Sequence, residues 1–150
     1  MLQAIALGVY GVLAPVSSGA KLDRDGVRAR SRSSMRRLQS FLDVALLDDG
    51  DELELDAIVK NLGVDELVSL RVWTHRLGHA ARPPRPLAFR WLSNRWGLRP
   101  SECLYVPGTE PLAIAARSAG WCVSPRPVNG FPDLETLVER LDSGARPWET

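Results

Sequence analysis

The chain has 150 residues, with 19 Lys+Arg against 18 Asp+Glu, a formal net charge of +1 and 45% hydrophobic residues. This length fits one domain, and the near-zero charge excludes a generic polyanion binder and a disordered acidic tail, because either needs an excess of one sign along the whole chain. Two cysteines are too few for a disulfide scaffold, so we expect a reduced, cytoplasmic protein.

The start of the chain is apolar but lacks the features of a targeting signal. No Lys or Arg precedes residue 21, and no apolar run reaches the length of a membrane span. We therefore interpret residues 4–9 as a buried strand and expect no membrane association.

Next in the chain comes a segment in which positive charge is concentrated. Residues 21–37 hold seven basic and two acidic residues, so this stretch is +5 and the remainder is −4. The Ser- and Arg-rich composition predicts a flexible basic loop at about 15–33. No aromatic residue interleaves with these arginines, so the sequence favours a solvated loop with incidental contacts over a nucleic-acid site. Docking on an acidic protein surface, including the acidic stretch 48–56 of a neighbouring copy, is a second option.

Strands and helices are predicted to alternate along the whole chain. Short apolar runs predict strands at 4–9, 44–47, 68–73, 104–106 and 121–123. Helical spacing predicts helices that start near Ser34, with Ser34 as N-cap, and that lie around 55–62, 87–96, 111–119 and 134–141. This order predicts a three-layer α/β, Rossmann-like fold whose parallel sheet has helices on both faces, with a short tail at about 143–150.

Two segments resemble the haloacid dehalogenase-like (HAD) hydrolase superfamily. Residues 88–123 resemble its C-terminal half, in which a helix leads into a strand, a metal-binding loop and a second helix. Residues 4–15, AIALGVYGVLAP, resemble the first motif, in which a hydrophobic strand precedes DxDGVL or DxYGTL, and VALLDD at 44–49 stands in the place of the second. The resemblance implies one domain over residues 1–150, with five parallel strands in the order 5-4-1-2-3 and no cap domain.

The catalytic residues of the superfamily do not carry over. Its first strand ends in an Asp that attacks the substrate and forms a covalent intermediate, and further acids hold Mg²⁺. By the resemblance, the nucleophile position is Gly8 and the acid/base position is Tyr10. The positions of the second-motif Ser or Thr, the third-motif Lys and the two metal-binding acids are Asp48, Pro83, Gly108 and Leu112.

These replacements predict a pseudoenzyme without cofactor or metal, a binding or regulatory protein that acts through protein–protein contacts or self-association. Two alternatives stay open: a phosphatase- or dehalogenase-type hydrolase that uses Mg²⁺ and atypical residues such as Asp48, Asp23 or Glu110, and a receptor for a small anion. Candidate ligand contacts are Tyr10, Asp48, Arg85, Thr109 and Glu110. Candidate partner-binding residues are Arg28, Arg30, Arg32, Trp96 and Trp148.

Three further features have two interpretations each, and two have one. Residues 48–56 hold six acids, which form either a cation site or, as we favour, the acidic first turn of a helix. Residues 23–27 match DxDGV but do not follow a buried strand, so we interpret them as a turn. His75 and His79 could share a metal only on a helix, and we expect them on the surface. Trp91 is expected in the core, and the two cysteines on adjacent strands.

Overall fold

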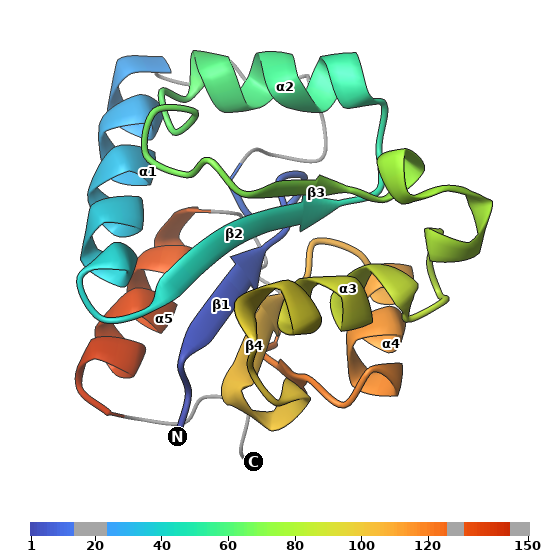
Figure 1. Ribbon diagram of the computed structural model, residues 1–150. Helices are drawn as coiled ribbons and strands as arrows, with labels where there is room; N and C mark the ends of the chain where they lie inside the picture. Colours follow the sequence, from blue (N-terminus) through green and yellow to red (C-terminus); the bar gives the residue numbers. More distant parts are fainter. Residues whose placement is uncertain (14–23, 126–130, 145–150) are drawn as a thin grey trace.

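A single parallel sheet organises the protein, whose computed structural model describes residues 1–13, 24–125 and 131–144. The strands lie in the order β3-β2-β1-β4-β5, which is the predicted order seen from the other edge (Figure 1). They are β1 (Ala4–Leu7), β2 (Asp43–Asp48), β3 (Arg71–Trp73), β4 (Cys103–Val106) and β5 (Cys122–Val123). The predicted strand at 68–73 is shorter than expected, because only its last three residues pair with β2.

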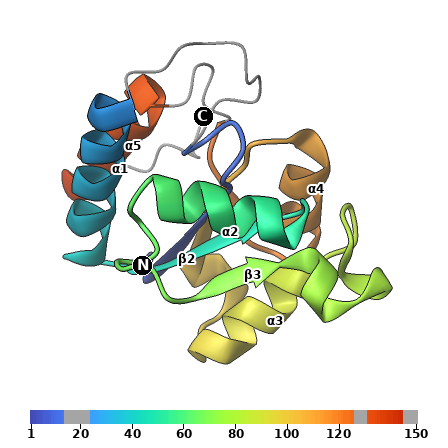
Figure 2. The same cartoon turned by 90° about the horizontal axis from the view of Figure 1, so that it is seen from above.

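Helices cover both faces of the sheet, as predicted. The first face carries α1 (Arg24–Gln39), α2 (Glu52–Asn61) and α5 (Phe131–Asp142), and the second carries α3 (Leu87–Trp96) and α4 (Glu110–Ser118) (Figures 1 and 2). Alternate residues of β1 enter the two cores, with Ile5 and Leu7 on the first face and Ala4 and Ala6 on the second. Burial of both faces explains why this strand is apolar throughout.

Three short 3-10 segments complete the second half of the chain: Thr74–Leu77, His79–Ala81 and Pro100–Glu102. The part of the sequence that the structure describes contains no separately folded cap unit between the strands. None of its helices is long and apolar enough to cross a membrane.

The prediction of a flexible basic loop over residues 15–33 is wrong for its second half. Helix α1 already includes Arg24, and Ser34, the predicted N-cap, lies buried near the middle of the helix. Met35 and Leu38 pack in the core, so contacts with the sheet and α5 stabilise α1. The polar composition of its first half did not predict a helix there. The first half of the predicted loop, and residues 145–150 of the predicted tail, lie outside the described residues.

Helix α3 buries a different face from the one predicted. Trp91 was expected in the core but is 40% exposed, and Leu87, one helical turn before it, is 41% exposed. The buried residues are Ala88, Phe89, Leu92 and Ser93. The Phe89 ring packs edge-on against the buried rings of Tyr105 and Trp121, and these contacts favour burial of this face of the helix.

Trp96, expected on the surface, is partly buried. Its ring lies 6.0 Å from that of Trp121, so it belongs to the second core rather than to a free surface. Trp148, the other predicted surface tryptophan, lies outside the described residues.

Candidate functional site

The carboxyl ends of β1, β2 and β4 meet at one edge of the sheet, where ligands bind in open parallel α/β folds. The connections that follow these strands bring together Gly8, Tyr10, Asp48 and Gly108, as the sequence predicts. Pro83 is half-buried beyond the second 3-10 segment. Leu112 is buried in the second core and faces no ligand.

A buried tyrosine fills the space beside Gly8. A Cβ at Gly8 would lie 3.3 Å from the hydroxyl oxygen of Tyr105 and 3.2 Å from the amide nitrogen of Gly108. The Tyr105 hydroxyl donates a 2.8 Å hydrogen bond to the carbonyl oxygen of Leu47, and the side chain is fully buried. A catalytic carboxylate at position 8 would therefore meet the Tyr105 hydroxyl at close range.

The loop after β4 closes against the loop after β1 at Gly108. A Cβ at this residue would lie 1.7 Å from the carbonyl oxygen of Tyr10, which is far inside van der Waals contact. Any residue other than glycine would push the two loops apart. A metal-binding acid at this position is thus incompatible with the loop arrangement that the chain adopts.

Asp48 is used to hold the backbone together. Its carboxylate accepts hydrogen bonds from the backbone N–H groups of Val9 (2.7 Å), Tyr10 (3.0 Å) and Asp49 (2.7 Å), and only 3% of the residue is exposed. Burial raises the pKa of this carboxyl above its ordinary value, although the three N–H donors act in the opposite direction. Asp48 ties β2 to the loop after β1, so neither of its oxygens is free to attack a substrate.

Tyr10 lies between the loop after β1 and the start of α2. Its ring approaches Gly50, where a Cβ would lie 3.2 Å from the tyrosine Cε2. Burial and a hydrogen bond to Glu54 raise the pKa of Tyr10 to about 12, with Asp48 and Asp51 adding to the effect. Its surroundings are acidic, which opposes binding of an anion such as phosphate.

These two tyrosines, the only ones in the sequence, predict a distinctive alkaline titration. Burial also raises the pKa of Tyr105 well above 10.0, so the native protein should form almost no phenolate at pH about 11, whereas both tyrosines should ionise near 10.0 in concentrated urea. Because the folded state holds these protons more tightly, its stability should fall as the pH rises above 10.0. Ultraviolet spectrophotometric titration measures both curves. A native phenolate signal near pH 10.0 would contradict the contacts described for Tyr10.

The acidic stretch behaves as a helix start, in agreement with the interpretation favoured from the sequence. Asp51 is the N-cap of α2 and accepts a 3.1 Å hydrogen bond from the Glu54 amide. Asp56 accepts a 2.9 Å hydrogen bond from the Trp73 indole and lies 3.5 Å from Arg71. Within the described parts of the chain, no group of three or more His, Cys, Asp or Glu residues is placed to hold a metal ion.

Asp49, which follows β2, is surrounded by polar and basic side chains. Its Oδ1 accepts a hydrogen bond from Thr74, and it lies 3.6 Å from His75 Nε2 and 3.7 Å from Arg82 Nε. His75 lies on a 3-10 segment that ends before His79, so the pair lacks the helical spacing a shared metal needs.

The other candidate ligand contacts lie on the surface and form no site. Glu110 begins α4, is exposed and pairs with Arg117 at 3.5 Å. Thr109 precedes it as an N-cap without a side-chain hydrogen bond. Arg85 is exposed and donates to the carbonyl oxygen of His79 at 3.4 Å.

The basic residues of α1 contact other parts of the same chain. Arg32 donates to the carbonyl oxygen of Gly63 and lies 3.7 Å from Glu66. Residues 24–27 of the DxDGV match form the start of α1, whereas Asp23 and the side chain of Arg28 lie outside the described residues. Cys103 and Cys122 are free thiols on the paired strands β4 and β5, as expected.

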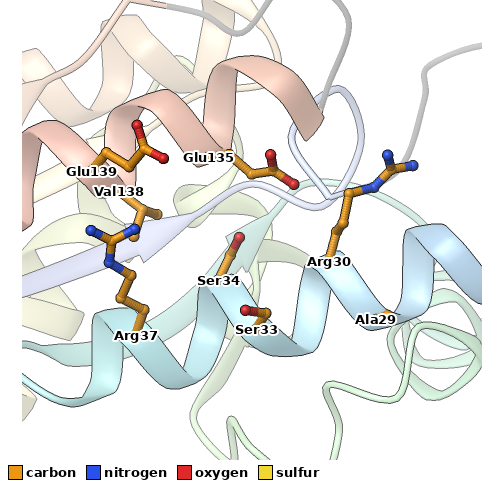
Figure 3. A pocket seen from close by; sticks show the side chains of 8 residues that line it. All are labelled: Ala29, Arg30, Ser33, Ser34, Arg37, Glu135, Val138 and Glu139. Atoms are coloured by element: carbon orange, nitrogen blue, oxygen red, sulfur yellow. The ribbon is translucent and has the colours of Figure 1, made fainter.

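A cavity of about 300 Å³ lies between α1 and α5 (Figure 3). Arg30 and Arg37 line it from α1, and Glu135 and Glu139 line it from α5, so its two sides carry opposite charges. Arg37 also forms a 2.9 Å ion pair with Asp142. The positive charge of α1 is thus partly balanced by α5 within the chain.

Comparison with known proteins identifies the fold. No family model and no curated protein sequence matches the chain. An uncharacterized protein from Corynebacterium glutamicum superposes with a TM-score of 0.69 at 18% identity, covering 95% of this chain and 96% of that one. A haloacid dehalogenase-like protein of unknown function from Agrobacterium tumefaciens superposes with a TM-score of 0.65 at 14% identity, covering 97% of this chain and 92% of that one. A HAD family hydrolase from Deinococcus radiodurans with bound phosphate and sodium superposes with a TM-score of 0.63 at 15% identity, covering 91% of this chain and 88% of that one. This protein therefore has the fold of the haloacid dehalogenase superfamily.

Proposed function

We propose that this protein is a non-catalytic member of the HAD-like fold, which acts by binding a protein partner. The observation that carries the proposal is the closure of the strand ends. The Tyr105 hydroxyl lies beside Gly8, the carbonyl oxygen of Tyr10 lies against Gly108, and Asp48 binds three backbone amides. A covalent aspartyl mechanism needs an ionised carboxylate at the end of β1, and the residue there is Gly8, where a Cβ would lie 3.3 Å from the Tyr105 hydroxyl oxygen.

The two alternative functions have less support. A hydrolase that uses Asp48 would have to break the hydrogen bonds of its carboxylate to three backbone N–H groups, one buried and two partly buried, before the carboxylate could reach a substrate. An anion receptor would have to accept its ligand beside Asp49, Asp51 and Glu54, whose charges oppose it. We therefore propose no site here for the phosphate and sodium that the Deinococcus radiodurans hydrolase binds.

A turnover assay tests the absence of catalysis. With a generic phosphate ester and Mg²⁺, we expect the native chain and the Asp48→Asn variant to release phosphate at the rate of the protein-free control. The Arg36→Ala variant, altered at an exposed residue of α1, controls for surface effects. We also expect Gly8→Asp to stay inactive, because Tyr105 occupies the adjoining space.

One result would overturn the proposal. It is saturable turnover by the native chain that depends on Mg²⁺ and is lost in Asp48→Asn while circular dichroism shows the variant to be folded.

The surface supports a binding role for residues other than those predicted. Leu53, Leu87, Trp91 and Ile114 are large apolar side chains that are each at least 40% exposed. Arg32, in contrast, contacts its own chain, and Trp96 packs in the second core. Tryptophan and arginine are enriched in protein interfaces, so the partner contact is better sought on α3, which exposes Trp91, than on α1.

A further inference from the structure

Positive charge is concentrated in a second segment that ends after α3. Residues 67–101 contain no acidic residue, and their arginines are Arg71, Arg76, Arg82, Arg85, Arg90, Arg95 and Arg99. Four of these have acidic partners: Arg71 and Arg76 bind Asp56, Arg82 lies 3.7 Å from Asp49, and Arg99 lies 3.1 Å from Glu102. The other three, Arg85, Arg90 and Arg95, are exposed and form no ion pair with any residue that the structure describes.

Two of these unpaired arginines lie on the same face of α3 as its two exposed apolar side chains. Leu87 and Trp91 are one helical turn apart, and Arg90 and Arg95 lie within one turn of them. We call these four residues the α3 surface. It is a basic surface with an apolar centre, and its tryptophan and arginines are the residue types that contribute most to protein interfaces.

The first turn of α2 carries the opposite combination. Leu53 is 79% exposed and stands between the carboxylates of Glu52 and Glu54, and we call these three residues the α2 surface. Glu52 is held by Arg76, and Glu54 accepts a hydrogen bond from Tyr10, so both carboxylates are restrained before any partner arrives. Restraint of this kind lowers the entropy lost on binding.

The two surfaces cannot meet within one chain. Helix α2 packs on the first core and α3 on the second, so the two helices lie on opposite faces of the sheet (Figures 1 and 2). They can meet only between two copies, where an exposed leucine among carboxylates would contact an exposed tryptophan among arginines.

We propose that this protein self-associates head to tail, with the α3 surface of one copy bound to the α2 surface of the next. Since the two surfaces differ, the contact is heterologous and leaves a free surface at each end of the assembly. The proposal rests on the binding role proposed above and names a second copy of the chain as the partner. Its failure would leave the absence of turnover untouched, because the two are measured independently.

Two complementary variants test the contact. Arg90→Glu/Arg95→Glu destroys the α3 surface and keeps the α2 surface, and Leu53→Arg does the reverse; all three side chains are exposed. In sedimentation velocity at low salt, the native chain should associate as its concentration rises, and each variant should remain a monomer. Mixing the two variants should restore one intact contact and give a 1:1 heterodimer that grows no further.

Controls separate this contact from a general effect of charge. Arg36→Glu/Arg140→Glu makes the same change in net charge at exposed positions of α1 and α5, and it should associate like the native chain. Raising the salt concentration about tenfold should weaken the native association by roughly tenfold, since the contact pairs opposite charges. Circular dichroism should show all variants to be folded.

Three results would overturn the proposal. They are a native chain that stays monomeric at every concentration, variants that associate like the native chain, and a mixture of monomeric variants that forms no heterodimer. Loss of association in the arginine variant together with full association of Leu53→Arg would show contact between two α3 surfaces instead, and would also refute it.

Discussion

Replacing Gly108 with alanine should lower the free energy of unfolding by about 3 kcal/mol, the upper part of the range for overpacked sites. The added Cβ would lie 1.7 Å from the carbonyl oxygen of Tyr10, and that atom belongs to the backbone, so no side-chain rotation relieves the clash. The loops after β1 and β4 would have to separate. Urea denaturation followed by circular dichroism measures the loss.

The neighbouring Thr109→Ala is the matched control. Thr109 is exposed and its side chain makes no capping hydrogen bond, so its substitution should change the stability by less than about 0.5 kcal/mol. If Gly108→Ala proves as stable as the native chain, the two loops are free to move apart. The closure on which we base the absence of catalysis would then be wrong.

Asp48→Ala should destabilise the fold by about 3 kcal/mol, because it leaves buried N–H groups without an acceptor. The three affected amides belong to Val9, Tyr10 and Asp49. Asp48→Asn keeps one carbonyl oxygen and should lose less. Equal stability of the alanine variant and the native chain would contradict the described role of the carboxylate.

The same residue predicts the pH dependence of stability. The pKa of Asp48 is raised above 3.8 by burial, so the folded state holds this proton more tightly than the unfolded state. The contribution of Asp48 to stability should therefore decrease as the pH rises from 3.8 through the folded-state pKa, and Asp48→Asn should lack this change. The difference between the two urea denaturation series, measured at several pH values, isolates the effect; a difference that increases with pH over this range would refute it.

Much of the fold could be predicted from the sequence, because the hydrophobic patterns that indicate strands and helices are local. A strand buried on both faces is a short apolar run, and a helix on the sheet repeats its apolar residues every three or four positions, so the order of elements follows from reading along the chain. The strand order came from the resemblance to the HAD superfamily and is confirmed. Helix α1 was partly missed, since its stability comes from Met35, Leu38 and the neighbouring α5, and not from its own composition.

Gly8, Tyr10, Asp48 and Gly108 lie close together, but the sequence analysis overlooked Tyr105, which lies beside them. Tyr105 lies in the apolar run of β4, and nothing local shows that its hydroxyl reaches Leu47, 58 residues away in sequence. A signal did exist, because a tyrosine in a strand buried on both faces needs a hydrogen-bond partner for its hydroxyl. The sequence likewise did not predict that Trp91 is exposed, because the contacts of Phe89 with Tyr105 and Trp121 decide which face of α3 is buried.

The sequence by itself determined that this protein alternates strands and helices, because this order follows from local periodicity. It also determined which residues, Gly8 and Gly108 among them, stand where the resemblance to the HAD superfamily would place acids, because a residue's identity is a property of a single position. The tertiary structure alone decided that Tyr105 and the carbonyl of Tyr10 close the place of those acids, and that Asp48 is bound to the backbone. It also decided which arginines have acidic partners and which remain on the α3 surface. The physical reason is that ion pairs, hydrogen bonds and steric closure depend on distances between residues far apart in the chain, and only folding sets those distances.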